Sequence, residues 1–367
     1  MKVVHIVEAS FAGVGRHVID LAEHQAGSHD VFVIYGSRRC SSDFVRRIEQ
    51  LPDISWFPLN IARDIGVGDI SSFISCRRLL KKIQPNIVHG HSSKGGALAR
   101  MCSDSTVGVF YTPNAMYTMN PGLSSLKKYM VSSIERLFSC RTTRIIAVSP
   151  EERDHMVLSG INRDKIVVIP NGIERPTKYL KSDVRKALGL SDNDFIIGFV
   201  GRIDAQKSPE KLLSIFKAYL SVQISDTKLA IVGDGPMLEE MKMYATKLGI
   251  NDHVCWLGFQ KGVWAMCAFD VFLLPSAYEG FPYVLLESIG VGVPFVTSDR
   301  ANASLLVNNG GAGSIVPLEQ DEKFVSGLLE MEKNLRAGLK RACVLDNRFL
   351  VSHMAAVTTD LYSRSSA

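Results

Sequence analysis

The sequence lacks several features that would set it apart from ordinary globular proteins. Its seven cysteines are scattered, odd in number and without a C-x-x-C pair, which argues against disulfides or a zinc site and is typical of a reducing compartment. No run of about 20 apolar residues occurs, so we expect no membrane span. Residues 1–7 are too short, and too soon interrupted by Glu8, to predict a secretory signal.

Basic residues only slightly outnumber acidic ones. The net charge is +5 over 367 residues, so we expect no nucleic-acid partner, although contact with an anionic membrane surface or a diphosphate is compatible with it. Internal repeats and low-complexity segments are missing. A hydrophobic content of 46% and a charged content of 22% suffice for two cores, and the length suggests two domains at roughly 150 residues each.

Apolar runs that we interpret as strands alternate with helical segments along the chain. Strands, some with a following turn, are expected at residues 3–7, 31–35, 54–57, 87–88, 107–114, 144–149, 166–169, 195–200, 228–236, 254–259, 271–274, 294–297 and 311–316. Helices are expected at residues 18–25, 44–51, 70–83, 123–138, 150–159, 184–188, 237–247, 263–268, 283–290, 300–309, 321–333, 335–344 and 348–362.

Two carboxylates bracket the loop and helix after the strand at 271–274. Glu279 lies in the loop, Pro282 suits the first position of the helix, and Glu287 follows one to two turns into it. The free N–H groups of the helix start attract anions, so a phosphate could bind there while the carboxylates accept protons from hydroxyl groups. A nucleotide sugar carries both kinds of group. The alternative is that Glu279 is a loop charge and Glu287 lies on a solvated helix face.

Two cations follow the strand at 195–200. Gly201-Arg202 ends this strand and Lys207 comes five positions later. Arginine can form a bidentate pair with phosphate oxygens and lysine acts as a point charge, so the pattern predicts a diphosphate site; the alternative is a solvated pair of charges. Gly233 follows the next strand and permits a close approach to a nucleotide.

In the first half, the loop at residues 9–17 contains Gly13, Gly15 and Arg16, and a helix is expected to begin at about Val18. A short Gly-x-Gly is weak evidence, because it is equally compatible with a plain strand-to-helix turn.

The strand at 87–88 ends in His89 and His91. We expect these histidines to point apart, with His89 structural. Metal binding is not expected, because no third ligand lies near in the sequence.

The residues at 279–287 and 201–207 resemble the motifs of the retaining glycosyltransferases of family 4. The resemblance covers nearly the whole chain and implies an α/β GT-B fold, with two Rossmann-like parallel-sheet domains facing across a cleft. It implies an acceptor-binding domain at 1–172 and a nucleotide-sugar-binding domain at 173–347, with residues 348–367 packing back on the first. Pro170-Asn171-Gly172 resembles the junction between the two.

The resemblance also implies roles for individual residues. The implied donor-binding residues are Gly15, Gly201, Arg202, Lys207, Gly233, Leu257, Gly258, Glu279, Gly280, Phe281, Pro282 and Glu287. The implied acceptor-binding residues are Gly13, Arg16, His91, Lys94 and Asn114, and the implied catalytic residues are Glu279, His91, Lys207 and Arg202. Asn114 is a departure, because many relatives carry histidine there.

The function implied is metal-independent transfer of a hexosyl or N-acetylhexosaminyl group, with retention, from a nucleotide diphosphate sugar to a saccharide acceptor, expected to be lipid-linked. No Asp-x-Asp pair stands at a strand end, so no cofactor or metal is expected, and a UDP-sugar is the favoured donor. The expected setting is bacterial surface polysaccharide synthesis in the cytoplasm. Two alternatives stay open, a non-hydrolysing sugar-nucleotide epimerase and a catalytically silent GT-B binding module.

The helix expected at 123–138 allows two interpretations. Lys127, Lys128 and Arg136 accompany an apolar stripe at helical spacing. The stripe could pack inward, as in an ordinary surface helix. It could also form a basic amphipathic surface that contacts anionic lipid, where a lipid-linked acceptor would lie and the protein would be peripheral on the inner membrane face.

Overall fold

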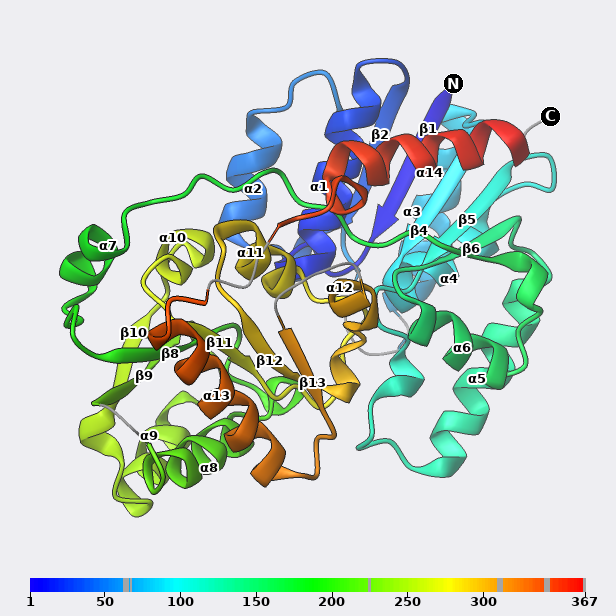
Figure 1. The fold of residues 1–367 in the computed structure, drawn as a ribbon. Coiled ribbons are helices and arrows are strands. Elements are labelled where there is room, and N and C mark those ends of the chain that lie inside the picture. Colours follow the sequence, from blue (N-terminus) through cyan, green and yellow to red (C-terminus); the bar gives the residue numbers. More distant parts are fainter. Residues whose placement is uncertain (62–65, 67, 224–225, 309–312, 340–343, 366–367) are drawn as a thin grey trace. The chain divides into compact units, whose positions relative to one another are not determined.

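The computed structural model describes residues 1–61, 66, 68–223, 226–308, 313–339 and 344–365. The chain divides into two compact units, Met1–Gly172 with Arg348–Ala367, and Ile173–Asn347. Each unit is built on one parallel sheet with helices between successive strands (Figure 1). The parallel-sheet α/β architecture predicted from the sequence is confirmed in both units.

The first unit has a seven-stranded sheet in the order β3-β2-β1-β4-β5-β6-β7. Its strands are β1 (Lys2–Val7), β2 (Asp30–Gly36), β3 (Ser55–Leu59), β4 (Ile87–His91), β5 (Gly108–Thr112), β6 (Arg144–Ala147) and β7 (Ile166–Val168). Its helices are α1 (Ala12–Ala26), α2 (Ser42–Glu49), α3 (Gly68–Ile83), α4 (Ser92–Cys102), α5 (Ser125–Ser139), α6 (Pro150–Leu158) and α14 (Val351–Ser365).

The second unit has a six-stranded sheet in the order β10-β9-β8-β11-β12-β13. Its strands are β8 (Phe195–Val200), β9 (Thr227–Val232), β10 (Val254–Gly258), β11 (Val271–Leu274), β12 (Phe295–Ser298) and β13 (Gly313–Val316). Its helices are α7 (Lys181–Leu188), α8 (Pro209–Leu220), α9 (Leu238–Lys247), α10 (Gly262–Met266), α11 (Tyr283–Val291), α12 (Ser304–Asn308) and α13 (Asp321–Arg336).

The central strands have no polar face. Every residue of β8 and β11 is buried, and so is every residue of β1 except Lys2. Helices cover both faces of such sheets, so their strands are continuous apolar runs instead of alternating ones. Residues that end these strands at the carboxyl edge of each sheet are therefore held by a rigid core, and ligands of open α/β sheets bind at this edge.

Helix α14 completes the first unit from the far end of the chain. It lies along α1 (Figure 1), and Val351, Met354 and Ala355 pack in one core cluster with Leu21 of α1 and Ile146 of β6. The last helix is therefore an integral part of the fold of the first unit.

Helix α1 begins earlier than expected. It starts at Ala12, so Gly13, Gly15 and Arg16 lie in helix and the expectation of a loop up to His17 was wrong. The Gly15 N–H donates to the Phe11 carbonyl at 3.1 Å. A Cβ at Gly15 would lie 3.0 Å from the Ser10 carbonyl carbon, so the glycine allows close packing where its low helix propensity had suggested a loop.

Two expected helices in the second unit are shorter in the structure. The segment expected at 300–309 is a 3₁₀ turn, Asp299–Ala301, followed by α12, because Asn302 adopts a left-handed conformation with φ 55°. A second expected helix at 335–344 is not formed at its start, since α13 ends at Arg336 and Gly338 follows with φ 70°. Residue 309 of the first expectation and residues 340–343 of the second lie outside the described residues, as do residues 311 and 312 of the turn and strand expected at 311–316.

None of the described helices combines the length and the apolar content that a membrane span needs.

Candidate functional site

Lys207 and Glu279 meet at the carboxyl edge of the second sheet. They follow the neighbouring strands β8 and β11. The Lys207 Nζ lies 2.5 Å from Glu279 Oε1, and Ser276 Oγ donates to the same oxygen at 2.8 Å. Both charged side chains are largely shielded, with 16% of Lys207 and 9% of Glu279 exposed. Shielding of this kind strengthens the attraction between the two charges.

Backbone hydrogen bonds fix the loop that carries Glu279. The Glu279 N–H donates to the Arg300 carbonyl at 3.0 Å, and the Asn302 amide donates to the Glu279 carbonyl at 2.6 Å. Gln206 holds the loop from the β8 side, because its carbonyl accepts from Ala277 N–H at 2.8 Å and its side chain donates to the Tyr278 carbonyl at 3.1 Å. The Glu279 carboxylate is therefore held in place from two neighbouring segments.

Glu287 is the second shielded carboxylate of this unit. It lies on α11 and is 8% exposed, and Glu279 is buried as well, so the alternative of a solvated loop charge and a solvated helix face is wrong for both. Phe281 is buried at 3% exposure. Helix α11 begins at Tyr283, as expected, and Pro282 is its N-cap instead of its first residue. Gly280 lies between Glu279 and this helix start.

Three predicted glycines lie at the ends of adjacent strands. Gly233 has φ 138° and its N–H donates to the Gly258 carbonyl at 2.8 Å. A Cβ at Gly233 would lie 1.9 Å from the Gly201 carbonyl oxygen, and one at Gly201 would lie 3.5 Å from Lys207 Cε. The ends of β8 and β9 therefore approach one another closely because Gly233 lacks a side chain.

Arg202 and Leu257, both predicted to bind the donor, already interact with other groups of the protein. Arg202 pairs with Asp204 at 3.3 Å and its side chain is 54% exposed; the ion pair with Glu279 is made by Lys207. The Leu257 carbonyl accepts from the Gln260 side chain at 3.0 Å, and the Gly258 carbonyl accepts from Gly233. The carbonyls of these two predicted donor-binding residues therefore already accept one hydrogen bond within the protein.

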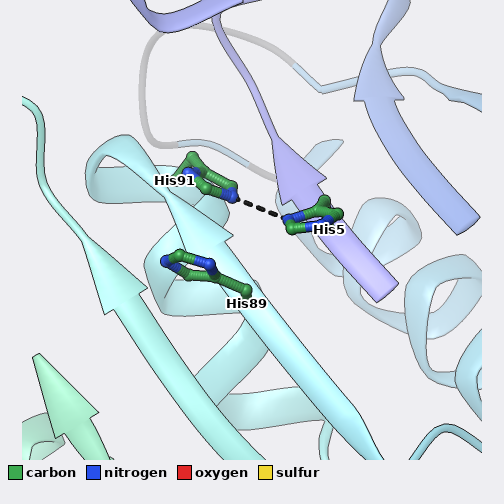
Figure 2. A group of neighbouring side chains, drawn as sticks. All are labelled: His5, His89 and His91. Atoms are coloured by element: carbon green, nitrogen blue, oxygen red, sulfur yellow. Dashed lines mark hydrogen bonds between the residues drawn. The ribbon is translucent and has the colours of Figure 1, made fainter. Parts of the chain in front are cut away.

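In the first unit, three histidines cluster at the carboxyl edge of the sheet. His5 of β1 and both His89 and His91 of β4 have ring nitrogens within 4.8 Å of one another (Figure 2). The ring centroids of His89 and His91 are 4.0 Å apart, so the expectation that these two side chains point apart was wrong. Residues two apart in a strand share a face, and parallel pairing of His5 with His89 supplies the third ring.

Hydrogen bonds occupy almost every nitrogen of this cluster. His5 Nδ1 lies 3.0 Å from His91 Nε2, and His5 Nε2 lies 2.8 Å from Gln25 Oε1. His89 Nδ1 lies 2.5 Å from the Tyr362 hydroxyl and its Nε2 lies 2.7 Å from Thr112 Oγ1. Three imidazoles at this spacing are suitable ligands for a transition metal, but a metal would replace these bonds, and we retain the prediction of no metal on that ground.

Burial keeps the imidazoles neutral. It lowers the pKa of His5 to about 4, and it lowers the pKa of His91 well below its usual value, with the charges of His89 and His5 acting in the same direction. His17 is affected in the same way, because burial lowers its pKa to about 4 although Asn171 hydrogen-bonds its Nδ1 at 3.1 Å. Neutral imidazoles each have one N–H donor and one acceptor nitrogen.

Seven buried polar side-chain atoms of this unit have no hydrogen-bond partner within the described part of the chain, and three of them are both ring nitrogens of His29 and Glu151 Oε2. The other four are Ser10 Oγ, His91 Nδ1, Ser92 Oγ and Asn114 Nδ2. These four lie at or just after the ends of β1, β4 and β5, which are adjacent in the sheet. Buried polar atoms in native proteins are nearly all hydrogen-bonded, to protein, water or ligand, so these four grouped atoms are available to a polar ligand at this edge. Ser10 was missed by the sequence analysis, although a polar residue just after the first strand was a usable signal.

The other residues predicted to bind acceptor are differently placed. Arg16 pairs with Asp20 at 3.3 Å, and Lys94 pairs with Asp69 at 2.7 Å. Gly13 is exposed in the first turn of α1, and Asn114 has φ 55°. His91 and Asn114 thus belong to the set of unpartnered groups, whereas Arg16 and Lys94 have carboxylate partners.

Helix α5 carries its apolar stripe outward. Its buried residues are Glu135 and Ser139; Arg100 donates to Glu135 at 2.7 Å, and the Tyr111 hydroxyl donates to it at 3.3 Å. The interpretation of a stripe that packs inward was therefore wrong. The exposed stripe consists of Leu126, Tyr129, Met130, Ile134 and Leu137, each between 49% and 71% exposed.

Both units match families of known proteins. Residues 181–342 match the family described as "Glycosyl transferases group 1", and residues 11–175 match "Glycosyltransferase Family 4". An Escherichia coli protein, "UDP-Gal:alpha-D-GlcNAc-diphosphoundecaprenol alpha-1,3-galactosyltransferase", is 31% identical over 292 residues, 76% of this chain and 74% of its own. An uncharacterised 41.2 kDa protein in the cps region of Klebsiella pneumoniae is 26% identical over 99% of both chains.

The fold is also that of solved structures. The HepE protein of Anabaena, in complex with UDP and glucose, superposes with a TM-score of 0.81 at 19% identity, over 99% of this chain and 100% of that one. WaaG, described as a glycosyltransferase involved in lipopolysaccharide biosynthesis, superposes with a TM-score of 0.70 at 17% identity, over 100% of this chain and 97% of that one. The fold predicted from the sequence, GT-B, is confirmed.

Proposed function

Because this chain belongs to the family 4 glycosyltransferases, we propose that it is a retaining, metal-independent enzyme that moves a hexosyl or N-acetylhexosaminyl group from a UDP-sugar to a lipid-linked saccharide. The Escherichia coli relative is named for a UDP-sugar donor and a diphosphoundecaprenol acceptor, which supports both substrate classes. The Klebsiella relative in a cps region supports a setting in bacterial surface polysaccharide synthesis. We place this protein in the cytoplasm, at the inner face of the plasma membrane.

The observation that carries this proposal is the shielded pair of Lys207 and Glu279 beside Gly201. A donor diphosphate attracts Lys207, because it carries two negative charges whereas the Glu279 carboxylate carries one. Glu279 then accepts hydrogen bonds from hydroxyl groups of the donor sugar, and Glu287 accepts those of the ribose. Arg202, exposed and close in sequence, adds a second cation to the diphosphate.

Transfer follows from these contacts. The bond between the anomeric carbon and the diphosphate oxygen breaks, and its electron pair leaves with the diphosphate. The acceptor oxygen forms the new bond on the same face of the sugar, and its proton passes to the departing phosphate. Lys207, Arg202 and the N-terminus of α11 stabilise the negative charge that develops, which is the work that a metal ion does in other enzymes.

The first unit would supply the acceptor side. Its unpartnered groups, Ser10, His91, Ser92 and Asn114, offer donors and acceptors for the hydroxyl groups of a saccharide. The exposed stripe of α5, flanked by Lys127 and Lys128, would rest on anionic lipid. Apolar side chains enter the interface while the lysines neutralise headgroups, so the lipid part of the acceptor remains in the membrane during transfer.

Substitution of Lys207 and Glu279 tests the reaction. We expect Lys207→Ala and Glu279→Gln each to lower transfer by roughly 100-fold or more, because each removes a group that acts on the charge of the transition state. The assay follows nucleotide release from UDP-, GDP- and dTDP-sugars, with and without a lipid-diphosphate saccharide, and NMR of the product gives the anomeric configuration. Lys242→Ala, on α9 in the same unit, is the matched control.

Each outcome decides between the candidates. Near-normal turnover in both variants would remove the assignment of these residues, and an inverted product would exclude retention. An epimerase would convert the donor without acceptor, and a silent module would bind nucleotide sugar without turnover.

A further inference from the structure

A continuous line of buried hydrogen bonds ends at His91. Gln25 on α1 donates from Nε2 to Thr359 Oγ1 on α14 at 3.2 Å, and its Oε1 lies 2.8 Å from His5 Nε2. His5 Nδ1 then lies 3.0 Å from His91 Nε2 (Figure 2). Gln25, His5 and His91 are buried, with at most 1% exposed. No further hydrogen bond continues the line past His91, because its Nδ1 has no partner in the described residues.

The amide oxygen of Gln25 sets the direction of every proton in this line. A carbonyl oxygen only accepts, so His5 Nε2 must carry the N–H. A neutral imidazole has one N–H, which leaves His5 Nδ1 as an acceptor. His91 Nε2 must then donate to it, and His91 Nδ1 is left with a free lone pair. The line thus selects one of the two neutral tautomers of His91.

The surrounding groups agree with this orientation of the Gln25 amide. Its nitrogen carries two hydrogens and faces two hydroxyl groups, those of Thr359 and Tyr362. Burial raises the pKa of Tyr362 and the hydrogen bond with Gln25 opposes that rise. The Tyr362 hydroxyl can therefore donate onward to His89 Nδ1, which leaves the His89 N–H on Nε2, where it donates to Thr112 Oγ1.

We propose that Gln25 and His5 are positioning residues that hold His91 in the Nε2–H tautomer, so that its Nδ1 accepts a hydrogen bond from a hydroxyl group of the bound saccharide. This inference rests on the proposed function, because a saccharide must bind beside His91. Neither Gln25 nor His5 contacts the substrate. Their role is to present a lone pair, which a hydroxyl group satisfies and which a fluorine or a hydrogen in the same place does not.

NMR of the unliganded protein tests the tautomer without any assay of transfer. In protein labelled with ¹⁵N-histidine, long-range proton–nitrogen correlations report which ring nitrogen carries the hydrogen, and His91→Gln assigns the signal. We expect His91 Nδ1 without hydrogen and Nε2 with hydrogen. A hydrogen on His91 Nδ1 in the wild-type protein would overturn the proposal, and it would mean that the Gln25 amide is reversed.

A variant of Gln25 tests the consequence for transfer. Gln25→Leu has a similar volume but no acceptor for His5 Nε2, so we expect His91 to populate both tautomers and turnover to fall roughly tenfold, the effect of one neutral hydrogen bond. Acceptors in which one hydroxyl is replaced by fluorine should be poor for the wild-type enzyme and relatively better for Gln25→Leu, since an N–H can contact fluorine. His24→Gln, an exposed histidine on the same helix, should change neither.

The outcomes separate this inference from the function on which it rests. A single unchanged tautomer and unchanged turnover in Gln25→Leu would refute the positioning role while transfer itself stands. A wild-type protein that transfers no sugar would refute the proposed function, and the NMR result would still decide the tautomer. If Gln25→Leu does not fold, the wild-type spectrum and the fluorinated acceptors remain decisive.

Discussion

At neutral pH His5 and His17 are uncharged, because burial lowers the pKa of each to about 4. In the unfolded chain the pKa of histidine is about 6.5. Between these two values the unfolded chain binds a proton that the folded protein excludes. The stabilisation is therefore complete above about pH 6.5 and is lost as the pH falls toward 4. Each imidazole removes roughly 2 kcal/mol of unfolding free energy by about pH 5.

We expect His17→Gln to weaken the loss of stability between about pH 7.5 and pH 5. The difference from the wild type is the informative quantity, because burial raises the pKa of Glu152 to about 7 and this group acts in the opposite direction. Urea denaturation of the full chain, followed by fluorescence at both pH values, measures the effect. His24→Gln should leave the pH dependence unchanged; an equal dependence in His17→Gln and the wild type would contradict the argument.

The histidine cluster shows where sequence reasoning succeeds at this scale and where it stops. That His89 and His91 share one face follows from the period of a strand, and our expectation misapplied it. The third ring could not be predicted, because His5 lies 84 residues from His89 and meets it only through the pairing of β1 with β4. The shielding of Glu279 likewise depends on Gln206 and Asn302, which no local motif connects.

Among the helices and strands, α5 most clearly shows what the spacing of apolar residues can and cannot predict. The helical spacing of its apolar residues indicated an amphipathic helix, and the structure has one at almost the expected residues. The pattern cannot say which face is buried. Arg100, 1% exposed, lies 4.0 Å from the ring of Tyr111 and pairs with Glu135, so a charged pair holds the helix and its apolar residues face outward. Exposed stripes of this kind mark interaction surfaces.

We expect a Lys127→Ala/Lys128→Ala double variant to bind anionic vesicles roughly tenfold or more weakly, because each lysine near an anionic surface contributes about 1 kcal/mol. Sedimentation with vesicles that contain phosphatidylglycerol measures this, at low and at physiological salt. A Lys81→Ala/Lys82→Ala variant removes two exposed lysines from α3 of the same unit and should bind as the wild type does. Unchanged sedimentation of the Lys127/Lys128 variant would reject the lipid contact.

At the scale of the whole molecule, the sequence predicted the two parallel sheets well, since buried parallel strands are continuous apolar runs and nearly every expected run became a strand. Helix ends were less predictable. Gly15 suggested a loop where packing requires a helical glycine, and α8 at Pro209–Leu220 was not expected at all. The helical Gly15 depends on packing across the fold, whereas α8 carried a usable signal, because Pro209 begins it and Leu212, Phe216 and Tyr219 follow at helical spacing.

We expect UDP to stabilise the second unit without any metal. Ligand at about 100 times its dissociation constant contributes roughly 2.7 kcal/mol, and calorimetry in the presence of EDTA should show the shift in one of the unfolding transitions. GDP and dTDP should shift it less. In Glu287→Ala and Arg202→Ala the shift should shrink, because we propose that these side chains bind the ribose and the diphosphate. A shift that requires added Mg²⁺ would contradict the metal-independent mechanism.

Helix α14 imposes an order on biosynthesis. The ribosome makes residues 2–168, with all seven strands of the first sheet, before it makes any strand of the second. Gln25 and His89, however, can form their hydrogen bonds with Thr359 and Tyr362 only after the second unit has been translated. Until then the nascent first unit exposes Leu21 and an incomplete hydrogen-bond network. We infer that the second unit can fold co-translationally while the first matures last, which makes the first unit the natural client of chaperones during synthesis.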